Sequence, residues 1–375
     1  MNTHYRFIEP LDVLFLRGNK LFGDPGSFGE SLIPPWPSVA AGAIRSRMLA
    51  DAGINLARFA KGDEPHHELG TPQQPGPFTL TAFQLARRTA QGVEPLFAPP
   101  ADLVISQGDD GITLQRLQPK TTAPGLDSSS TQALLPILAQ AKRGKPVSGY
   151  WLTQQGWQTY LQGGTPKPTD LVKNQDLWKI DPRVGVGLDT EQRSAADGKL
   201  FSMQAVALSH DVGFVAVVQN ATPPNDGLLR LGGDGRAAAL SPVELKWPEP
   251  DYEAIAQAGR CRLVLTTPSI FPDGWRPTGT DGSDLIELDG IRARLACAAV
   301  PRGETLSGWD LANKCPKPAQ RAAPGGSVYW LDKLEASPAA LRQWVQQGLW
   351  QGNEDPARRA EGYNRFTLAA WSDEA

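Results

Sequence analysis

Short runs of strand-forming residues, each closed by a turn, dominate the second half of the 375-residue sequence. The clearest runs are KLFSMQAVAL, VGFVAVVQ, LLRLGG, CRLVLTTP and SVYWL. The clearest late helix is SPAALRQWVQQGLW, with Ser337 as N-cap and Pro338 at its first position. Strands with few intervening helices predict an α+β fold and not a doubly wound parallel sheet.

The start of the sequence predicts a strand, a glycine-rich loop and a helix. Residues 5–16 are apolar on both faces, which is typical of a buried strand, and RGNKLFGDPGSFGES follows as the loop. Apolar residues then recur every fourth position from Ala40 to Met48, as on one face of a helix. Ser38 is placed to cap that helix and Gly53 to end it.

The length predicts two domains, because a single hydrophobic core stops growing at roughly 250 to 300 residues. A composition shift at QGGTPKPTD, residues 162–170, marks the boundary. We therefore expect one domain over residues 1–165 and a second over 166–375. The Pro-, Gly- and Ser-rich stretches 58–77 and 118–131 predict surface insertions.

The net charge of −3 excludes bulk attraction to nucleic acid, so any site for a polyanion has to be local. The three cysteines are odd in number and widely spaced, which indicates neither a disulfide framework nor a zinc site. No signal peptide and no run of about 18 apolar residues is evident. We expect a cytoplasmic protein with no membrane partner.

Two motifs resemble enzyme sites but lack the context that those sites need. GGSVY has no closing glycine of the GxSxG nucleophile elbow, and no histidine follows His210, so a serine hydrolase is disfavoured. LGGDGRAA matches GxGxxA, but Pro242 breaks the helix that a dinucleotide site requires. A tight hairpin turn is the preferred interpretation, and a dinucleotide-dependent oxidoreductase stays a distant alternative.

The candidate metal ligands are equally unconvincing. His66, His67 and Glu68 are adjacent, so their side chains point apart, and their Pro- and Gly-rich setting predicts a solvated surface patch. Asp109 and Asp110 are explained by a turn between two strands. We assign no metal and no cofactor.

Basic residues beside glycines in predicted loops are more informative. Four loops carry them: the one with Arg17, the stretch between Arg183 and Arg193, the turn with Arg236, and the run from Lys314 to Arg321. Any one of these residues is more often a solvated charge, but together they suggest a polyanion held between backbone amides and side chains. The nearby Trp275, Trp309 and Tyr329 are candidates for base stacking, although core packing is the commoner use of each.

The motifs, taken in order, resemble the RAMP superfamily of CRISPR proteins, and within it the third subunit of the type III-B Cmr effector complex. The resemblance rests on PLDVLFLRGNKLFG, PPWPSVAAGAIRSRM, RVGVGLDTEQRSAADGKLF, LRLGGDGR, TTPSIFPDGWRP, SGWDLANKCPKPAQRAAPGGSVYW and GYNRFTLAAW. The family commonly has PAGSVY where this chain has PGGSVY, and its terminal glycine pair is here Gly362 with Asn364. Residues 58–150 carry little of the resemblance.

The resemblance implies two ferredoxin-like, RRM-type domains that face each other, with loop and hairpin insertions, and GGSVYW as the glycine-rich loop of the second. It implies a non-catalytic subunit that holds the repeat-derived 5′ tag of the crRNA. Its partners would be the large polymerase-like subunit, the backbone RAMP subunit and, indirectly, target RNA. The RNA contacts that we expect are Arg17, Asn19, Lys20, Arg45, Arg183, Arg193, Arg236, Arg276, Lys314, Lys317, Arg321, Gly325, Gly326 and Ser327.

The enzyme alternative is a metal-independent endoribonuclease that processes crRNA, an activity found in sister RAMP proteins. Such enzymes often use a histidine to move the proton. Only His210 lies among the family motifs, since His4 precedes the first predicted strand and His66 and His67 lie in an insertion.

Overall fold

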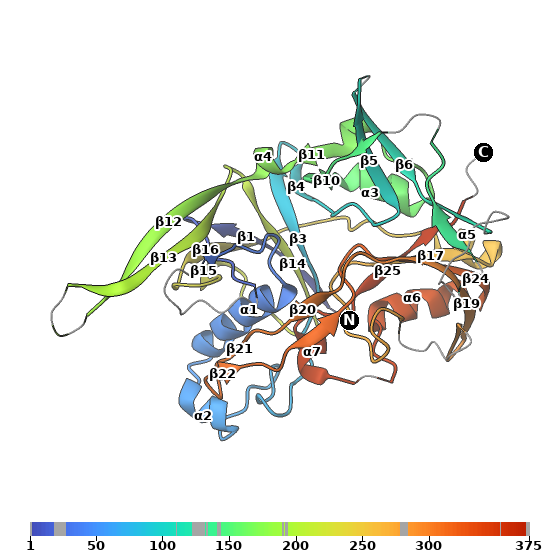
Figure 1. Cartoon of the computed structure of the whole chain (residues 1–375). Helices are drawn as coiled ribbons and strands as arrows, with labels where there is room; N and C mark the ends of the chain where they lie inside the picture. Colours follow the sequence, from blue (N-terminus) through green and yellow to red (C-terminus); the bar gives the residue numbers. More distant parts are fainter. Residues whose placement is uncertain are drawn as a thin grey trace. The chain divides into compact units, whose positions relative to one another are not determined.

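The computed structural model contains the whole chain. The structure describes residues 2–18, 28–109, 111–121, 132, 134–140, 144–189, 191, 194–277, 284–352 and 354–372. These residues form a mixed α+β fold with many small sheets and few helices (Figure 1). No helix within them is long and apolar enough to cross a membrane.

The chain divides into two compact units, each assembled from separate segments. The first unit contains residues 1–93, 175–244 and 305–320, and the second contains 94–174, 245–304 and 321–375. The domain limits 1–165 and 166–375 stay a prediction.

The first unit is built on a six-stranded sheet. Its strand order is β15 (Gly227–Arg230), β16 (Ala237–Pro242), β1 (Thr3–Pro10), β14 (Val212–Gln219), β3 (Thr79–Thr89) and β4 (Gly92–Pro95). Strand β1 pairs antiparallel with both β14 and β16, and β14 pairs antiparallel with β3. The central strand β14 is buried on both faces up to Val218, which explains its continuous apolar sequence.

Helix α1 (Pro37–Asp51) follows β1 and contacts β3 and β15. Ala40 and Met48 are buried along it, as the four-residue spacing predicts, and Gly53 follows its end with φ of +66°. The prediction of Ser38 as N-cap is wrong, because Trp36 occupies that position and makes no side-chain cap hydrogen bond. Pro37 decides the start: its fixed φ suits the first helical position and pushes the preceding residue out of the helical region.

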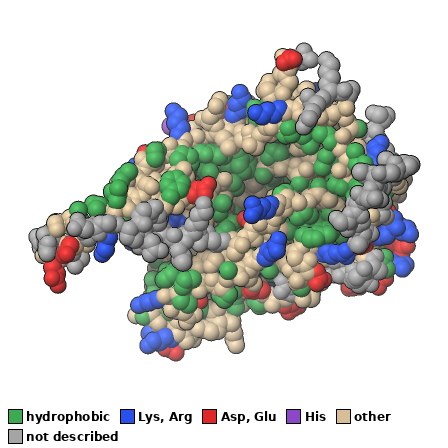
Figure 2. All heavy atoms as spheres, viewed as in Figure 1, with side chains coloured by type: hydrophobic (Ala, Val, Ile, Leu, Met, Phe, Trp, Pro, Cys, Tyr) green, Lys and Arg blue, Asp and Glu red, His purple; other side chains and the backbone are tan. Residues whose placement is uncertain are grey.

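A long antiparallel hairpin also belongs to the first unit and forms the ribbon at the left of Figure 1. It consists of β12 (Trp178–Leu188) and β13 (Ala195–Leu208), and β2 (Phe28–Gly29) pairs with β13. Ile180, Val184 and Val186 alternate along one face, and Leu200 lies opposite Val186 in the register. All four are exposed, Val184 to 72%, and Figure 2 shows hydrophobic side chains on the surface of this ribbon.

The second unit is built on a five-stranded sheet. Its strand order is β18 (Leu285–Leu288), β19 (Ile291–Ala299), β24 (Val328–Ala336), β17 (Cys261–Leu265) and β25 (Phe366–Ala370). Helix α6 (Pro338–Gln347) contacts β25, and its buried Leu341 and Trp344 belong to the core of this sheet. The predicted start of α6 is confirmed, because the side chain of Ser337 accepts a hydrogen bond from the Ala340 amide and Pro338 follows it.

The remaining elements are short. The helices are α2 (Leu56–Lys61), α3 (Gln154–Leu161), α4 (Asn174–Leu177), α5 (Tyr252–Ala258), α7 (Pro356–Ala360) and a 3-10 helix (Pro168–Asp170). The small sheets pair β5 (Leu103–Gly108) with β6 (Gly111–Arg116) and β9 (Lys145–Pro146), β7 (Gln118–Lys120) with β8 (Leu135–Ile137), β10 (Tyr150–Leu152) with β11 (Leu171–Lys173), β20 (Glu304–Leu306) with β23 (Gln320–Ala322), and β21 (Trp309–Asp310) with β22 (Cys315–Pro316). The turn predicted at Asp109 is confirmed between β5 and β6, and Asp110 lies outside the described residues.

Four strands of each sheet share one order. Across the first sheet these strands are β16, β1, β14 and β3, and all three neighbouring pairs are antiparallel. Numbered by their place in the sequence, they are the fourth, first, third and second of the set. Strands β17, β19, β24 and β25 have the same order and directions in the second sheet. Helix α1 connects the first two strands of the first set, whereas α6 and α7 connect the last two of the second set.

Candidate nucleic-acid interface

Two of the predicted RNA contacts converge on one aromatic ring in the first unit. The guanidinium carbon of Arg183, on β12, lies 5.9 Å from the ring centroid of Phe15, and that of Arg236 lies 5.0 Å from it. Phe15 itself is 5% exposed. Three segments far apart in the sequence therefore place two cations around one buried ring, at a distance typical of cation–π contacts.

The turn that carries Arg236 is the tight hairpin turn predicted from LGGDGRAA. It joins β15 to β16, and Gly232, Asp234 and Gly235 all have positive φ. The turn is fixed to the Phe15 segment, because the Gly233 amide donates to the Phe15 carbonyl at 2.8 Å. A Cβ added at Gly232 would lie 2.8 Å from that same carbonyl oxygen, so this close approach requires glycine.

Each arginine of the pair is held by one carboxylate. Arg183 lies 2.9 Å from Asp181, and Arg236 lies 2.6 Å from Asp12. The two side chains remain 41% and 26% exposed, respectively. A guanidinium has five N–H donors and a carboxylate occupies two at most, so both arginines keep donors for a phosphate.

The other predicted contacts of the first unit are more scattered. Arg17 is exposed and forms an isolated antiparallel bridge with Ser31, and Arg45 is half-buried on α1. Lys314 is exposed with φ of +52°, and the Lys317 amide donates to the Gly308 carbonyl. Asn19, Lys20 and Arg193 lie outside the described residues.

The glycine-rich loop of the second unit is largely tied into its own sheet. The Gly326 amide donates to the Leu265 carbonyl at 2.7 Å, and the Gly326 carbonyl accepts from the Ala101 amide at 2.8 Å. Ser327 is fully buried, and its hydroxyl donates to the Pro324 carbonyl at 2.7 Å. Gly325 is the exposed residue of the three, so a ligand at this loop would meet Gly325 first.

Tyr329 faces the protein interior and supports a neighbouring tryptophan. Its ring is fully buried and lies parallel to the Trp275 indole within 4°, with centroids 6.5 Å apart. Its hydroxyl donates to the Trp275 carbonyl at 2.6 Å. Burial raises the pKa of Tyr329, so the hydroxyl stays protonated as a donor.

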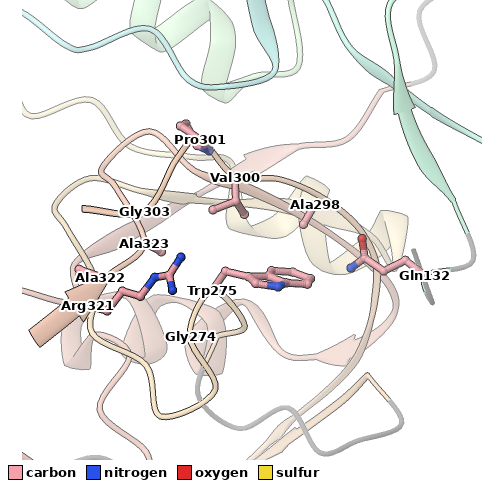
Figure 3. Close-up of a pocket in the computed structure, with 10 residues that line it drawn as sticks. All are labelled: Gln132, Gly274, Trp275, Ala298, Val300, Pro301, Gly303, Arg321, Ala322 and Ala323. Carbon is pink, nitrogen blue, oxygen red and sulfur yellow. The ribbon is translucent and has the colours of Figure 1, made fainter. Parts of the chain in front are cut away.

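A pocket of about 430 Å³ opens beside Trp275 in the second unit. Figure 3 shows the indole below Ala298 and Val300, with the Arg321 guanidinium at one end of the pocket and Gln132 at the other. The lining residues are Gln132, Gly274, Trp275, Ala298, Val300, Pro301, Gly303, Arg321, Ala322 and Ala323. Arg276 follows Trp275, places its guanidinium 5.4 Å from the indole centroid, and pairs with Asp284 at 2.6 Å.

The prediction of a solvated surface patch at His66–Glu68 is wrong for His66. That residue is 6% exposed, and its Nδ1 accepts hydrogen bonds from the Glu68 and Leu69 amides at 3.1 and 3.3 Å. Burial, followed by the neighbouring His67, lowers the pKa of His66. The histidine therefore closes a turn, and no group of three or more metal-ligating side chains occurs among the described residues.

Sequence reasoning missed two residues that shape these sites. Phe15 was assigned only to a buried strand, yet it is the ring between Arg183 and Arg236. Gly303 has no side chain to crowd Arg321, since an added Cβ would lie 3.3 Å from Arg321 Nε. Neither residue stands beside its partner in the sequence, so local motifs gave no signal.

The comparisons with known proteins place the chain among the CRISPR-associated proteins. The model of the family described as CRISPR-associated protein (Cas_Cmr3) matches residues 6–371. The chain belongs to this family and is a Cmr subunit of CRISPR defence. No curated protein matches the sequence.

Two solved structures are similar to the chain over nearly its whole length. One is from a Type III-B Cmr-beta bound to cognate target RNA and AMPPnP, with a TM-score of 0.49, 16% identity, and coverage of 97% of this chain and 98% of that chain. The other is from Type III-B Cmr-beta bound to cognate target RNA, with a TM-score of 0.48, 15% identity, and coverage of 96% of each chain.

Proposed function

We propose that this chain is the non-catalytic third subunit of a type III-B effector complex, a RAMP protein that holds the repeat-derived 5′ tag of the crRNA. Its protein partners are the large polymerase-like subunit and the backbone RAMP subunit, and it meets target RNA only indirectly. The family membership supports the complex, and the arginine pair at Phe15 supports the RNA.

The arginine pair is the observation that carries the proposal. A near-neutral chain cannot hold RNA by a broad positive field, so it needs local, directed donors. Arg183 and Arg236 meet that need, because each is oriented by a carboxylate and by one shared ring. A phosphate bound between them would accept charge-assisted hydrogen bonds from both guanidinium groups.

The proposed fold is a pair of ferredoxin-like, RRM-type domains with insertions. The common strand order of the two sheets, with antiparallel neighbours, supports it. In a ferredoxin-like domain, two strand–helix–strand units are interleaved in one sheet, and this interleaving gives the same strand order. On this view α1 is the crossover helix retained by the first domain, and α6 is the one retained by the second.

Charge reversal tests the RNA role. We expect Arg183→Glu and Arg236→Glu to weaken binding of tag-bearing crRNA by the full chain, while thermal unfolding stays within a few degrees of the wild type. Each lost phosphate contact should also flatten the log–log salt dependence of the affinity by about 0.7. Arg58→Glu is the matched control, since Arg58 is 63% exposed on α2. Equal affinities for all three variants and the wild type would contradict the proposal.

The endoribonuclease alternative depends on one histidine. His210 Nδ1 lies 2.7 Å from Asp211 Oδ2, an arrangement that can hold an imidazole in one tautomer. Its side chain is 94% exposed, which supports a solvated turn residue instead. Incubation of the purified chain with repeat RNA in EDTA separates the two functions: site-specific cleavage that His210→Ala abolishes would establish the nuclease.

A further inference from the structure

The pocket beside Trp275 has the size and lining of a site for one small planar group. Its volume of about 430 Å³ falls within the range of small-molecule sites, roughly 300 to 1,000 Å³. Small apolar residues, among them Ala298, Val300 and Pro301, line it together with the indole (Figure 3). They leave room that a bulky aliphatic side chain would otherwise fill.

The indole is fixed in place and still accessible. The Trp275 backbone is held by the Tyr329 hydroxyl at 2.6 Å, and the Tyr329 ring lies parallel to the indole. Trp275 nevertheless remains 39% exposed, with the Arg276 guanidinium 5.4 Å from its ring centroid. A rigid, accessible indole loses little conformational entropy when a second ring stacks on it.

The charge at the pocket favours an anion next to that ring. Arg321 is the only charged residue among the ten that line the pocket. The side chain is exposed, and within the part of the chain that the structure describes it has no ion-pair partner. An aromatic face and an unpaired guanidinium in one pocket match two parts of a nucleotide, its base and its phosphate.

We propose that this pocket takes one unpaired base of an RNA strand, which stacks on Trp275 while the adjoining phosphate pairs with Arg321. The inference rests on the proposed function. It adds a site at which one base of the RNA turns away from its neighbours and enters the protein. Recognition by stacking is tolerant of base identity, so the pocket fixes the register of the RNA and not its sequence.

The test is a fluorescence scan with the full chain. A set of tag-bearing RNAs carries 2-aminopurine at one position each, and stacking on the indole should quench one member of the set. Trp275→Leu should abolish that quenching and raise Kd roughly 5- to 150-fold, the range for loss of one stacked base. Trp275→Phe keeps a ring and should restore most of the affinity.

The arginine is tested with a matched pair of variants. Arg321→Gln should raise Kd and flatten the salt dependence by about 0.7, whereas Arg302→Gln should leave both unchanged. Arg302 is an exposed arginine between two lining residues, Pro301 and Gly303, and does not line the pocket itself. Thermal unfolding of all variants reports any loss of fold.

The outcomes separate the two proposals. If wild-type chain does not bind tag-bearing RNA, the proposed function fails and the pocket assignment fails with it. If the chain binds RNA but no position is quenched, or quenching persists in Trp275→Leu, only the pocket assignment is overturned. One quenched position that depends on Trp275 supports it.

Discussion

Arg262 and Asp102 form a fully buried ion pair in the second unit, with Nη1 of the arginine 2.7 Å from Oδ2 of the aspartate. Tyr160 donates its hydroxyl to the other carboxylate oxygen at 2.7 Å, and its carbonyl accepts from Arg262 Nη2 at 2.9 Å. The network connects β17, α3 and the segment before β5. Burial raises the pKa of Tyr160 well above its ordinary value, which keeps the hydroxyl a donor.

Asp102→Asn should therefore destabilise the chain strongly. The substitution leaves the Arg262 charge buried without its counterion, a loss of about 3–5 kcal/mol in the free energy of unfolding. The control is Asp332→Asn, which breaks the pair with Arg294 on the sheet surface, where both side chains are partly exposed. That loss should stay below about 1 kcal/mol. Urea unfolding measures both, and equal losses would contradict the structural role of the buried pair.

Asn364 should be required for stability and not for RNA binding. Its backbone has φ of +55°, and its fully buried side chain accepts from the Ile270 amide and donates to the Ile270 and Leu349 carbonyls. We expect Asn364→Ala to lower the free energy of unfolding by about 2–4 kcal/mol, because three buried polar groups lose their partner. Asn364→Gly should cost about 1 kcal/mol less, since glycine adopts positive φ freely. A neutral Asn364→Ala would refute this account.

The two loop glycines should respond differently to alanine. Gly326 has φ of +88°, and an added Cβ would lie 3.4 Å from the Pro99 carbonyl oxygen. Gly326→Ala should thus lower the free energy of unfolding by about 1–2 kcal/mol. Gly325 has no such φ, and its added Cβ would be at least 3.6 Å from its neighbours, so Gly325→Ala should be nearly neutral. Chemical unfolding of both variants tests the distinction, and similar losses would argue against it.

Acid should destabilise the turn around His66. Because burial holds the folded-state pKa of His66 below the ordinary 6.5, the unfolded chain binds more protons below that pH. The stability that neutral His66 contributes is fully present above pH 6.5, and it is lost as the pH falls toward the lowered pKa of the folded state. His66→Asn keeps an acceptor for the turn but does not titrate, so its stability should fall less between pH 7.5 and 5.5.

Local sequence patterns predicted individual elements well. The spacing of apolar residues predicted α1, the Ser337–Pro338 start predicted α6, and the runs of strand-forming residues predicted β13, β14, β15, β17 and β24. The errors at Ser38 and His66 share a cause, because each residue was judged from its local sequence alone. At Ser38 the backbone preference of Pro37 prevailed, and at His66 two backbone amides needed an acceptor inside the turn.

Local sequence patterns could not predict which residues meet at the sites, because those residues are far apart in the sequence. Strand β1 pairs with β14 and β16, about two hundred residues away, and the turn that precedes β16 brings Arg236 to Phe15. The sequence predicted that Arg183 and Arg236 matter but not that they share a ring. Likewise, Trp275 and Arg321 were named separately, and only the fold brings both residues to the lining of one pocket.

The hairpin β12–β13 has a practical consequence. Its face of Ile180, Val184, Val186 and Leu200 leaves aliphatic side chains exposed to water. Such a surface favours concentration-dependent self-association of a purified chain. Solubility, more than folding, should therefore limit work with the isolated protein, and binding measurements are best made in dilute solution.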